Sequence, residues 1–247
     1  MRVTIIGSGD AFCSGGRAHC CIEVAAGGQA VLVDFGASAI LAFKAQGRSF
    51  EAIDAVIISH LHGDHFGGLP FLLLDCQFVS KRQRPLPILG PPGIRARLKS
   101  TFELLYPDLH GRAWSFDWPV IEVEPDVPVQ IAGFDLRTIA VHHPSGAPAT
   151  GLRLVRNGKT FAFSGDTGWT PRLFDIAAHA DLYVTECGSG AEKLPMHIDW
   201  PTLRDNLAAF SARKIVVTHL GPSALLRIAE MQAAGVMVGQ DGQVFDV

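Results

Sequence analysis

A run of metal-binding side chains follows an apolar segment in the first third of the chain. Residues 59–68 read Ser-His-Leu-His-Gly-Asp-His-Phe-Gly-Gly, which places His60, His62, Asp64 and His65 within six positions. In extended backbone His60 and His62 point the same way, and the intervening glycine permits a turn that brings Asp64 and His65 to a second point nearby. Imidazole and carboxylate without thiolate suit zinc, with manganese or iron as alternatives. The spacing predicts two adjacent divalent cations rather than a histidine-rich surface loop.

Two cations need more ligands than these four side chains, and the rest of the chain supplies candidates at the ends of expected strands. They are His142 or His143 in Val-His-His-Pro, Asp166 in Ser-Gly-Asp-Thr-Gly, and His219 in Thr-His-Leu-Gly. Functional sites are commonly built where loops leave a rigid scaffold. Alone, each residue would be read as a cap or a satisfied polar group. Beside the first cluster, we interpret them as further metal ligands.

The elements that position these side chains alternate between strands and helices, which is typical of an α/β chain. Strands are expected at residues 3–6, 20–24, 30–33, 55–59, 87–89, 134–141, 151–155, 160–163, 182–185 and 214–218. Helices are expected at residues 37–45, 69–78, 93–105 and 201–210, followed by a last helix and a short hairpin around residues 241–242. Residues 114–128 carry three prolines and are interpreted as a loop with edge strands. Two β-rich halves that each carry helices predict two packed sheets with helices outside.

Length and composition favour one domain that spans residues 1–247. The chain is 48% hydrophobic and 18% charged, which is enough apolar surface for a substantial core. Its 21 Lys and Arg residues against 24 Asp and Glu give a formal charge of -3, so no overall basic field would hold a long nucleic acid. We expect no membrane span and no secretory signal. Five cysteines without a Cys-x-x-Cys pair favour reduced thiols and a cytoplasmic location.

The order of the motifs resembles that of the metallo-β-lactamase fold hydrolases over nearly the whole chain: His-x-His-x-Asp-His, a later His, Ser-Gly-Asp-Thr and a final Thr-His. The resemblance implies an αββα sandwich of two mixed β-sheets flanked by helices. It implies one metal ion on His60, His62 and His143, a second on Asp64, His65 and His219, and Asp166 bridging both. We prefer His143 to His142 because Pro144 holds it extended and because the family's ligand stands in a Val-x-His context.

Further segments resemble the ribonuclease Z branch of phosphodiesterases within this superfamily. They are Gly7-Ser8-Gly9, Asp34-Phe35-Gly36, the Gly67-Gly68-Leu69-Pro70 that follows the histidines, Gly90-Pro91-Pro92-Gly93, and Ser164-Gly165-Asp166-Thr167. In that branch a His-Glu-Ala-Thr motif precedes a histidine that donates a proton or holds the phosphate. Glu186 and His197 take those places here, although Thr-Glu-Cys-Gly keeps only the glutamate. Asp34 would either hydrogen-bond a ligand imidazole or act as a turn residue at a strand end.

The resemblance also bears on the substrate. The branch's tRNA-processing members carry a long flexible arm, inserted in many of them between the third histidine and the bridging aspartate. Only 23 positions separate His143 from Asp166. We therefore expect a small-molecule or nucleotide phosphodiester rather than tRNA 3′ maturation. Two basic segments, residues 81–84 and 95–99, could pair with phosphate or be solvated helix ends.

The function implied is that of a dinuclear metal-dependent hydrolase in which a metal-bridging hydroxide attacks a phosphodiester. Asp64 would orient or deprotonate the water, and His197, positioned by Glu186, would protonate the leaving alkoxide. The alternatives are a hydrolase of a lactone, thioester, sulfate ester or lactam, and a non-catalytic carrier or binding module of the same fold. Related members of the branch are dimers, and residues 72–74 with Phe78 are candidates either for such a contact or for core packing.

Overall fold

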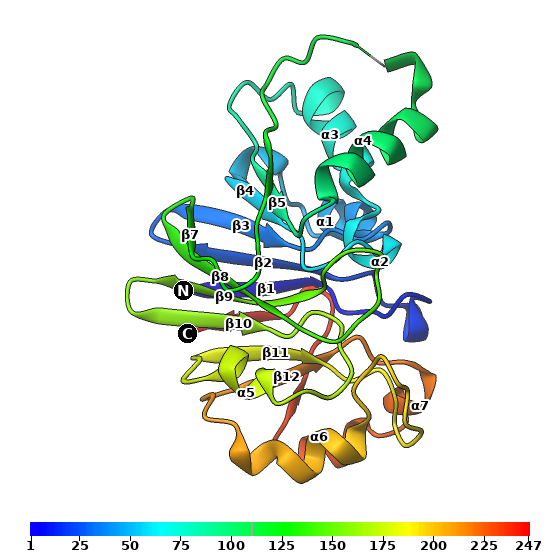
Figure 1. The fold of residues 1–247 in the computed structure, drawn as a ribbon, viewed down its shortest axis with the longest axis vertical. Helices are drawn as coiled ribbons and strands as arrows, with labels where there is room; N and C mark the ends of the chain where they lie inside the picture. The colour runs from blue at the N-terminus through cyan, green and yellow to red at the C-terminus, as the bar shows by residue number, and fades with distance from the viewer. Residues whose placement is uncertain (110) are drawn as a thin grey trace.

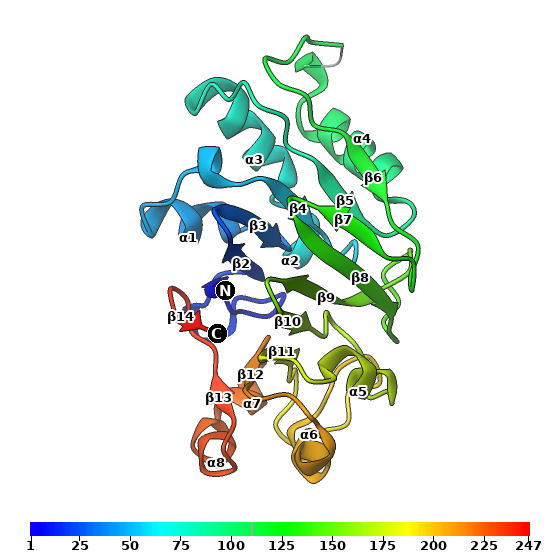
Figure 2. The ribbon, with the colours of Figure 1, turned by 90° about the vertical axis from the view of Figure 1, so that its left-hand side faces the viewer.

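Apolar strands pair into two seven-stranded sheets that lie face to face, as the computed structural model of the protein shows for residues 1–109 and 111–247 (Figure 1). The strand order is β14-β1-β2-β3-β4-β5-β6 in the first sheet and β13-β12-β11-β10-β9-β8-β7 in the second. Each sheet contains both parallel and antiparallel pairs. Helices cover the outer face of each sheet, so the predicted αββα sandwich is confirmed (Figure 2).

The first sheet is built from the N-terminal half of the chain and one C-terminal strand. Its strands are β1 (Arg2–Gly7), β2 (Cys21–Ala26), β3 (Gln29–Val33), β4 (Ala55–Ile57), β5 (Ile88–Gly90), β6 (Val120–Glu122) and β14 (Val244–Asp246). The helices of this half are α1 (Ala39–Ala45), α2 (Gly63–Phe66), α3 (Leu69–Leu74) and α4 (Ile94–Leu105). A π-helical turn, Asp75–Val79, continues α3, and short 3₁₀ turns lie at Ser14–Gly16, Phe50–Ala52 and Pro107–Leu109.

The second sheet comes from the C-terminal half. Its strands are β7 (Val129–Ile131), β8 (Phe134–Ala140), β9 (Thr150–Arg156), β10 (Lys159–Phe163), β11 (Leu182–Glu186), β12 (Ile215–Thr218) and β13 (Met237–Val238). The helices are α5 (Arg172–Ala177), α6 (Trp200–Asn206, followed by the 3₁₀ turn Leu207–Ala209), α7 (Pro222–Leu225) and α8 (Ile228–Ala233). The strands β9 and β10 form the hairpin that occupies most of the segment between His143 and Asp166.

The apolar core consists of three layers. One lies between the sheets and includes Ile22, Phe161 and Leu182. A second lies between the first sheet and its helices, and a third between the second sheet and its helices. Strand β11 is buried at every position because it is covered on both faces, which explains the apolar run Leu182–Val184 that precedes Thr185 and Glu186.

Several elements differ from the sequence-based expectation. The expected hairpin around residues 241–242 is wrong, because β13 pairs with β12 in the second sheet whereas β14 pairs with β1 in the first. The carboxylate of Asp241 accepts hydrogen bonds from the backbone N–H groups of Ser8 and Ala18, which holds the turn against the N-terminal segment. Helix α2 forms within the segment expected to be a histidine-rich loop, and β7 and α5 were not expected.

The residues considered for a dimer contact divide between core and surface. Leu72 and Leu73 in α3 are fully buried, whereas Leu74 is half-buried and Phe78 is exposed. Leu72 and Leu73 therefore pack in the core and are not available to a partner. All five cysteines are free thiols. Among the described residues, no helix combines the length and apolarity needed to cross a bilayer.

Candidate metal centre

The carboxyl ends of several strands meet at one edge of the sandwich and deliver the metal-binding side chains. In the first sheet, β4 leads into His60 and His62, and α2 follows directly with Asp64 and His65. In the second sheet, β8, β10 and β12 run in the same direction and lead into His143, Asp166 and His219. Residues that are up to 159 positions apart, His60 and His219, thereby reach one site.

The candidate ligands form two groups, each with its donor atoms within 4.8 Å of one another. The first group is His60, His62 and His143, and the second is Asp64, His65, Asp166 and His219. Three further groups overlap these two: Cys20 with Asp34 and His65, His143 with Asp166 and His197, and Glu186 with His197 and His219. In the first group, Nδ1 of His62 lies 3.0 Å from Nε2 of His143. In the second, Nε2 of His219 lies 3.1 Å from a carboxylate oxygen of Asp64. Tetrahedral zinc with bonds of 2.0–2.1 Å separates its ligands by about 3.4 Å, so both groups have the spacing of metal ligands.

Asp166 lies between the two groups. Its Oδ1 atom is 3.2 Å from Nε2 of His65, and its Oδ2 atom is 3.2 Å from Nε2 of His219. The same Oδ2 atom is 3.8 Å from Nε2 of His60 and 4.0 Å from Nε2 of His143. One carboxylate therefore faces donors from both groups.

Several buried donor atoms have no hydrogen-bonding partner in the described structure. They are Nε2 of His60, Nε2 of His65, Nδ1 of His219 and Oδ1 of Asp166. Buried polar atoms are normally paired, because an unpaired one carries its full desolvation cost. All of these atoms except Nδ1 of His219 face the other candidate ligands, which fits cations at these positions. The donor set, nitrogen and oxygen without thiolate, suits zinc, manganese or iron.

Asp34 supports the site from behind. Its Oδ2 atom lies 2.6 Å from Nδ1 of His65, and it also accepts hydrogen bonds from the backbone N–H and the hydroxyl of Ser59. The carboxylate thus fixes the orientation of His65 and leaves Nε2 for a cation. Asp34 and His219 both have positive φ, 59° and 58°, which costs a non-glycine residue about 1–3 kcal/mol. Both strained residues contact the candidate metal ligands directly. Sequence analysis did not identify Ser59.

The closely spaced histidines and carboxylates of the site shift one another's pKa values in the metal-free protein. Burial disfavours the charged form of His219, but the neighbouring Asp166 and the hydrogen bond that His219 donates to Asp64 raise its pKa to about 9. Burial likewise opposes charge on Asp64, yet His65 and His219 hold the pKa of Asp64 well below its usual range. The pKa of His65 is raised for a similar reason, because Asp166, Asp34 and Asp64 outweigh its burial. In the metal-free protein, the carboxylates therefore favour the protonated forms of His65 and His219.

His197 and Glu186 form a hydrogen-bonded pair beside the two groups of candidate ligands. Nδ1 of His197 lies 3.0 Å from Oε1 of Glu186, at the end of β11. Glu186 is buried and also accepts hydrogen bonds from the backbone N–H groups of Thr167 and Gly188, whereas the side chain of His197 is 26% exposed. Burial lowers the pKa of His197, but the hydrogen bond and charge of Glu186 raise it above 6.5 overall.

The structure distinguishes the neighbouring His142 and His143. His143 donates from Nδ1 to the carbonyl of Met196 and presents Nε2 to the site. In contrast, no group of candidate ligands among the described residues includes His142. Of the basic segments, Arg82 is fully buried and donates to four backbone carbonyls, so it is neither a phosphate ligand nor a solvated helix end.

A cavity of about 420 Å³ opens above the two groups. Its rim carries the apolar residues Phe12, Leu194 and Pro222 and the carboxylates Asp10 and Glu192. Phe12 is 85% exposed, and its loop is held by Asp10, which accepts hydrogen bonds from the backbone N–H groups of Phe12 and Ser14. Sequence analysis missed these rim residues, because they come from loops with no catalytic motif.

Known proteins resemble this chain in sequence and in fold. The family described as "Anti-Pycsar protein Apyc1" matches residues 1–244. Ribonuclease Z of Mycolicibacterium paratuberculosis is 32% identical over 193 residues, which cover 74% of this chain and 69% of that protein. Human tRNase Z, short form, superposes with a TM-score of 0.79 at 22% identity and covers 100% of this chain and 99% of its own.

The metallo-β-lactamase fold protein YhfI of Bacillus subtilis superposes with a TM-score of 0.77 at 22% identity, over 99% of this chain and 98% of its own. At such identities the two structures establish the fold, whereas the family match and the ribonuclease Z relative establish membership. The chain therefore belongs to the Apyc1 family and, with its ribonuclease Z relatives, to the metal-dependent hydrolases of the metallo-β-lactamase fold.

Proposed function

We propose that this chain, a single domain over residues 1–247, is a dinuclear metal-dependent phosphodiesterase that acts on a small, nucleotide-sized substrate. The observation that carries the proposal is the position of Asp166 between two groups of ligand atoms at the floor of one cavity. His60, His62 and His143 would hold one cation, and Asp64, His65 and His219 would hold the other. Asp166 would contribute its carboxylate to both. Zinc fits the nitrogen and oxygen donors best, with manganese or iron as alternatives.

Two such cations supply an activated water at neutral pH and neutralise charge on the phosphoryl oxygens. The chain's own residues do the rest. Asp64 orients the attacking water, because its carboxylate lies at the cavity floor beside His219. His197 protonates the leaving alkoxide, and its raised pKa keeps the proton available near neutral pH. Glu186 positions His197. Burial raises the pKa of the Glu186 carboxyl group, and the hydrogen bond and charge of His197 oppose that rise. The backbone N–H groups of Thr167 and Gly188 also donate to this carboxylate.

The cavity supports a small substrate. Its volume of about 420 Å³ suits a single nucleotide, within the range of small-molecule sites. The described residues that line it include no Lys or Arg, so a long RNA backbone would meet no cationic track there. The exposed ring of Phe12 offers a surface on which a base could stack. The β9–β10 hairpin occupies the segment where many tRNA-processing relatives insert an arm, which also favours a small phosphodiester.

The competing substrate classes are lactones, thioesters, sulfate esters and lactams, because the same chemistry attacks them. The apolar side chains Phe12, Leu194 and Pro222 at the rim would suit a hydrophobic ester of this kind.

The free cysteines are consistent with a reducing compartment such as the cytoplasm.

The decisive experiment compares phosphodiester hydrolysis with ester hydrolysis by protein loaded with zinc or manganese. The substrates are bis(p-nitrophenyl) phosphate, a nucleoside 3′,5′-cyclic monophosphate as the smallest nucleotide phosphodiester, a precursor tRNA, and a lactone and thioester panel. His62→Ala removes a ligand and excludes contaminants, and His142→Ala is the matched histidine control. Metal-dependent turnover of the small phosphodiesters, lost only in His62→Ala, supports the proposal. Turnover of the ester panel alone, by protein shown to hold two metal ions, would refute it.

A further inference from the structure

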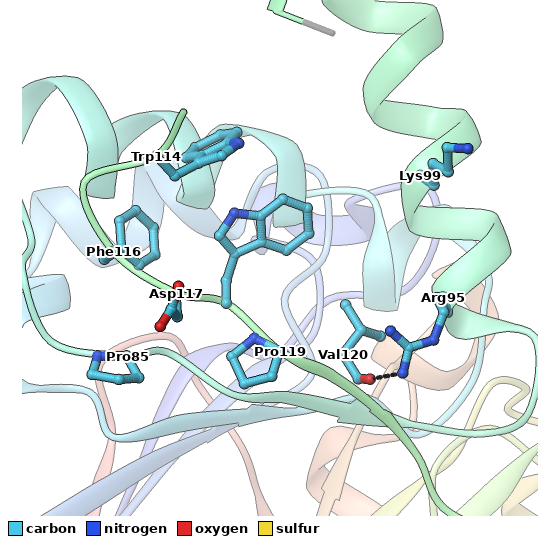
Figure 3. A pocket seen from close by; sticks show the side chains of 9 residues that line it. Pro85, Arg95, Lys99, Trp114, Phe116, Asp117, Pro119 and Val120 are labelled. Carbon is cyan, nitrogen blue, oxygen red and sulfur yellow. Dashed lines mark hydrogen bonds between the residues drawn. The ribbon is translucent and has the colours of Figure 1, made fainter. Parts of the chain in front are cut away.

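A second and larger cavity lies outside the first sheet, away from the metal centre. Its volume is about 730 Å³, and it opens between α4 and the segment that leads into β6 (Figure 3). Its lining shares no residue with the cavity over the metal ligands. The function proposed above makes no use of it.

One wall of this cavity is aromatic and held in a fixed arrangement. Trp114 contacts Trp118 edge to face, with ring centroids 5.4 Å apart, and contacts Phe116 at 6.0 Å. Phe116 is buried in the core, whereas both tryptophans are only partly buried. Aromatic rings that contact one another in this way keep their orientation and cost a ligand little ordering entropy. The wall therefore presents preformed π surface to a planar ring.

The charged groups of the cavity are separated. Arg95 and Lys99, one turn apart on α4, lie on one side, and Asp117 lies on the other with Trp114 and Phe116 (Figure 3). The guanidinium of Arg95 donates to the carbonyl of Val120, which holds it beside β6. The Lys99 ammonium is 71% exposed, and its one ion pair in the described structure, with Glu103 at 3.9 Å, is long. Both cations can still receive an anion.

We infer that this cavity is a second ligand site, which binds a planar aromatic phosphate of the size of a nucleoside monophosphate. The base packs against Trp114 and Trp118, whose rings offer it a stacking surface. The phosphate lies at Arg95 and Lys99, which form charge-assisted hydrogen bonds with its oxygens. Asp117 accepts a hydrogen bond from an N–H group of the base. The volume lies within the range of small-molecule sites.

The tryptophans themselves provide the test. The chain has four, and incorporation of 5-fluorotryptophan into the metal-loaded protein gives one fluorine resonance for each, assigned by single Trp→Phe substitutions. Trp114 and Trp118 report on this cavity, whereas Trp169 packs against Phe174 and Phe210 and Trp200 is buried, both outside it. The probes are 5′-AMP and 5′-CMP, which contain no phosphodiester, with adenosine and inorganic phosphate as partial ligands.

The expected result is a saturable shift of the Trp114 and Trp118 resonances by the nucleotides, at least tenfold weaker with adenosine or phosphate alone. Lys99→Glu should raise the dissociation constant for 5′-AMP at least tenfold. The matched charge reversal Lys214→Glu, at an exposed lysine beside β12, should leave it unchanged.

Three outcomes would overturn the inference. The first is the absence of a saturable shift at Trp114 and Trp118 up to about 10 mM nucleotide, a limit that corresponds to binding weaker than about 3 kcal/mol. The second is a saturable shift confined to Trp169 or Trp200, which would place the nucleotide outside this cavity. The third is a Trp114 and Trp118 shift that follows protein concentration and not ligand, which would make the cavity a contact between two copies. None of these bears on the phosphodiesterase assay, so the two proposals fail independently.

Discussion

Both carboxylate oxygens of Glu186 face the same nitrogen of His197, with Nδ1 at 3.0 Å from Oε1 and 3.1 Å from Oε2. Because Nδ1 is engaged by the carboxylate, Nε2 is the nitrogen that remains to donate to a substrate. This pairing lies at the end of β11, and His197 is also within 4.8 Å of ligand atoms of His143, Asp166 and His219. Metal content measured beside turnover therefore separates proton donation by His197 from metal binding.

The first prediction concerns the pH dependence of turnover. Glu186 raises the pKa of His197 above 6.5 despite the opposing effect of burial, so the donor is protonated below that pKa and activity falls as pH rises through it. Glu186→Gln removes the negative charge, which lowers the pKa of His197 and moves the basic limb of the profile of kcat against pH to lower pH. His197→Ala should lower kcat about 10²–10⁴-fold with metal content unchanged. An unshifted basic limb in Glu186→Gln would contradict the assignment.

The second prediction separates the neighbouring histidines by metal content. His143→Ala should bind about one metal ion fewer per chain, because its Nε2 atom faces His62 and Asp166. His142→Ala should keep the full content, since the backbone of His142 makes its hydrogen bonds with Thr167 and Gly168. Elemental analysis after dialysis measures both. Equal loss in the two variants would show that the assignment of the third ligand is mistaken.

The third prediction concerns the metal-free protein. The folded-state pKa of His219 is raised to about 9, so its protonation adds stability that is fully present below pH 6.5 and is lost as pH rises through 9. The urea midpoint of protein treated with a chelator should therefore fall between pH 6.5 and 9. Metal-loaded protein should not show this fall, because binding requires the ligands to be deprotonated. Parallel midpoints for the two forms across this window would argue against protons held in the empty site.

The fourth prediction concerns the buried Arg82. Its guanidinium donates to the carbonyls of Phe50, Ile53, Arg84 and Pro85, so Arg82→Met leaves these acceptors unpaired. The free energy of unfolding should fall by about 3 kcal/mol or more. Arg213→Met, at a side chain that is 75% exposed, should change it by less than about 1 kcal/mol. Urea denaturation measures both, and a similar change in the two variants would contradict the structural role.

The parts of this fold that could be predicted from sequence are those with a strong local signal. The run from His60 to His65 needs no tertiary information, because its spacing and its place after a buried strand indicate metal ligands. Asp166 and His219 could be added because each follows a strand. The sandwich itself was predicted from the alternation of β-rich and helical segments together with the family resemblance.

Other features depend on contacts that sequence does not display. Arg82 looks like part of an exposed basic segment until its four carbonyl partners are known. The turn before β14 resembles a hairpin, but Asp241 bonds to Ser8 and Ala18 and directs the strand to the other sheet. Phe12 reaches the rim of the metal cavity through a loop that Asp10 organises. For Arg82 and Asp241 the deciding partners lie far along the chain, whereas the loop of Phe12 is organised locally and only the folded chain shows where it lies.

The division of the ligands between the two sheets has a consequence for how the chain assembles. A cut in the segment between β6 and β7 would leave His60, His62, Asp64 and His65 on one fragment and His143, Asp166 and His219 on the other. Neither fragment alone would carry a complete ligand set, whereas β14 on the second fragment would still be able to pair with β1 on the first. Cations bound across the division would therefore act as cross-links, and metal concentration would control how tightly the two fragments reassociate.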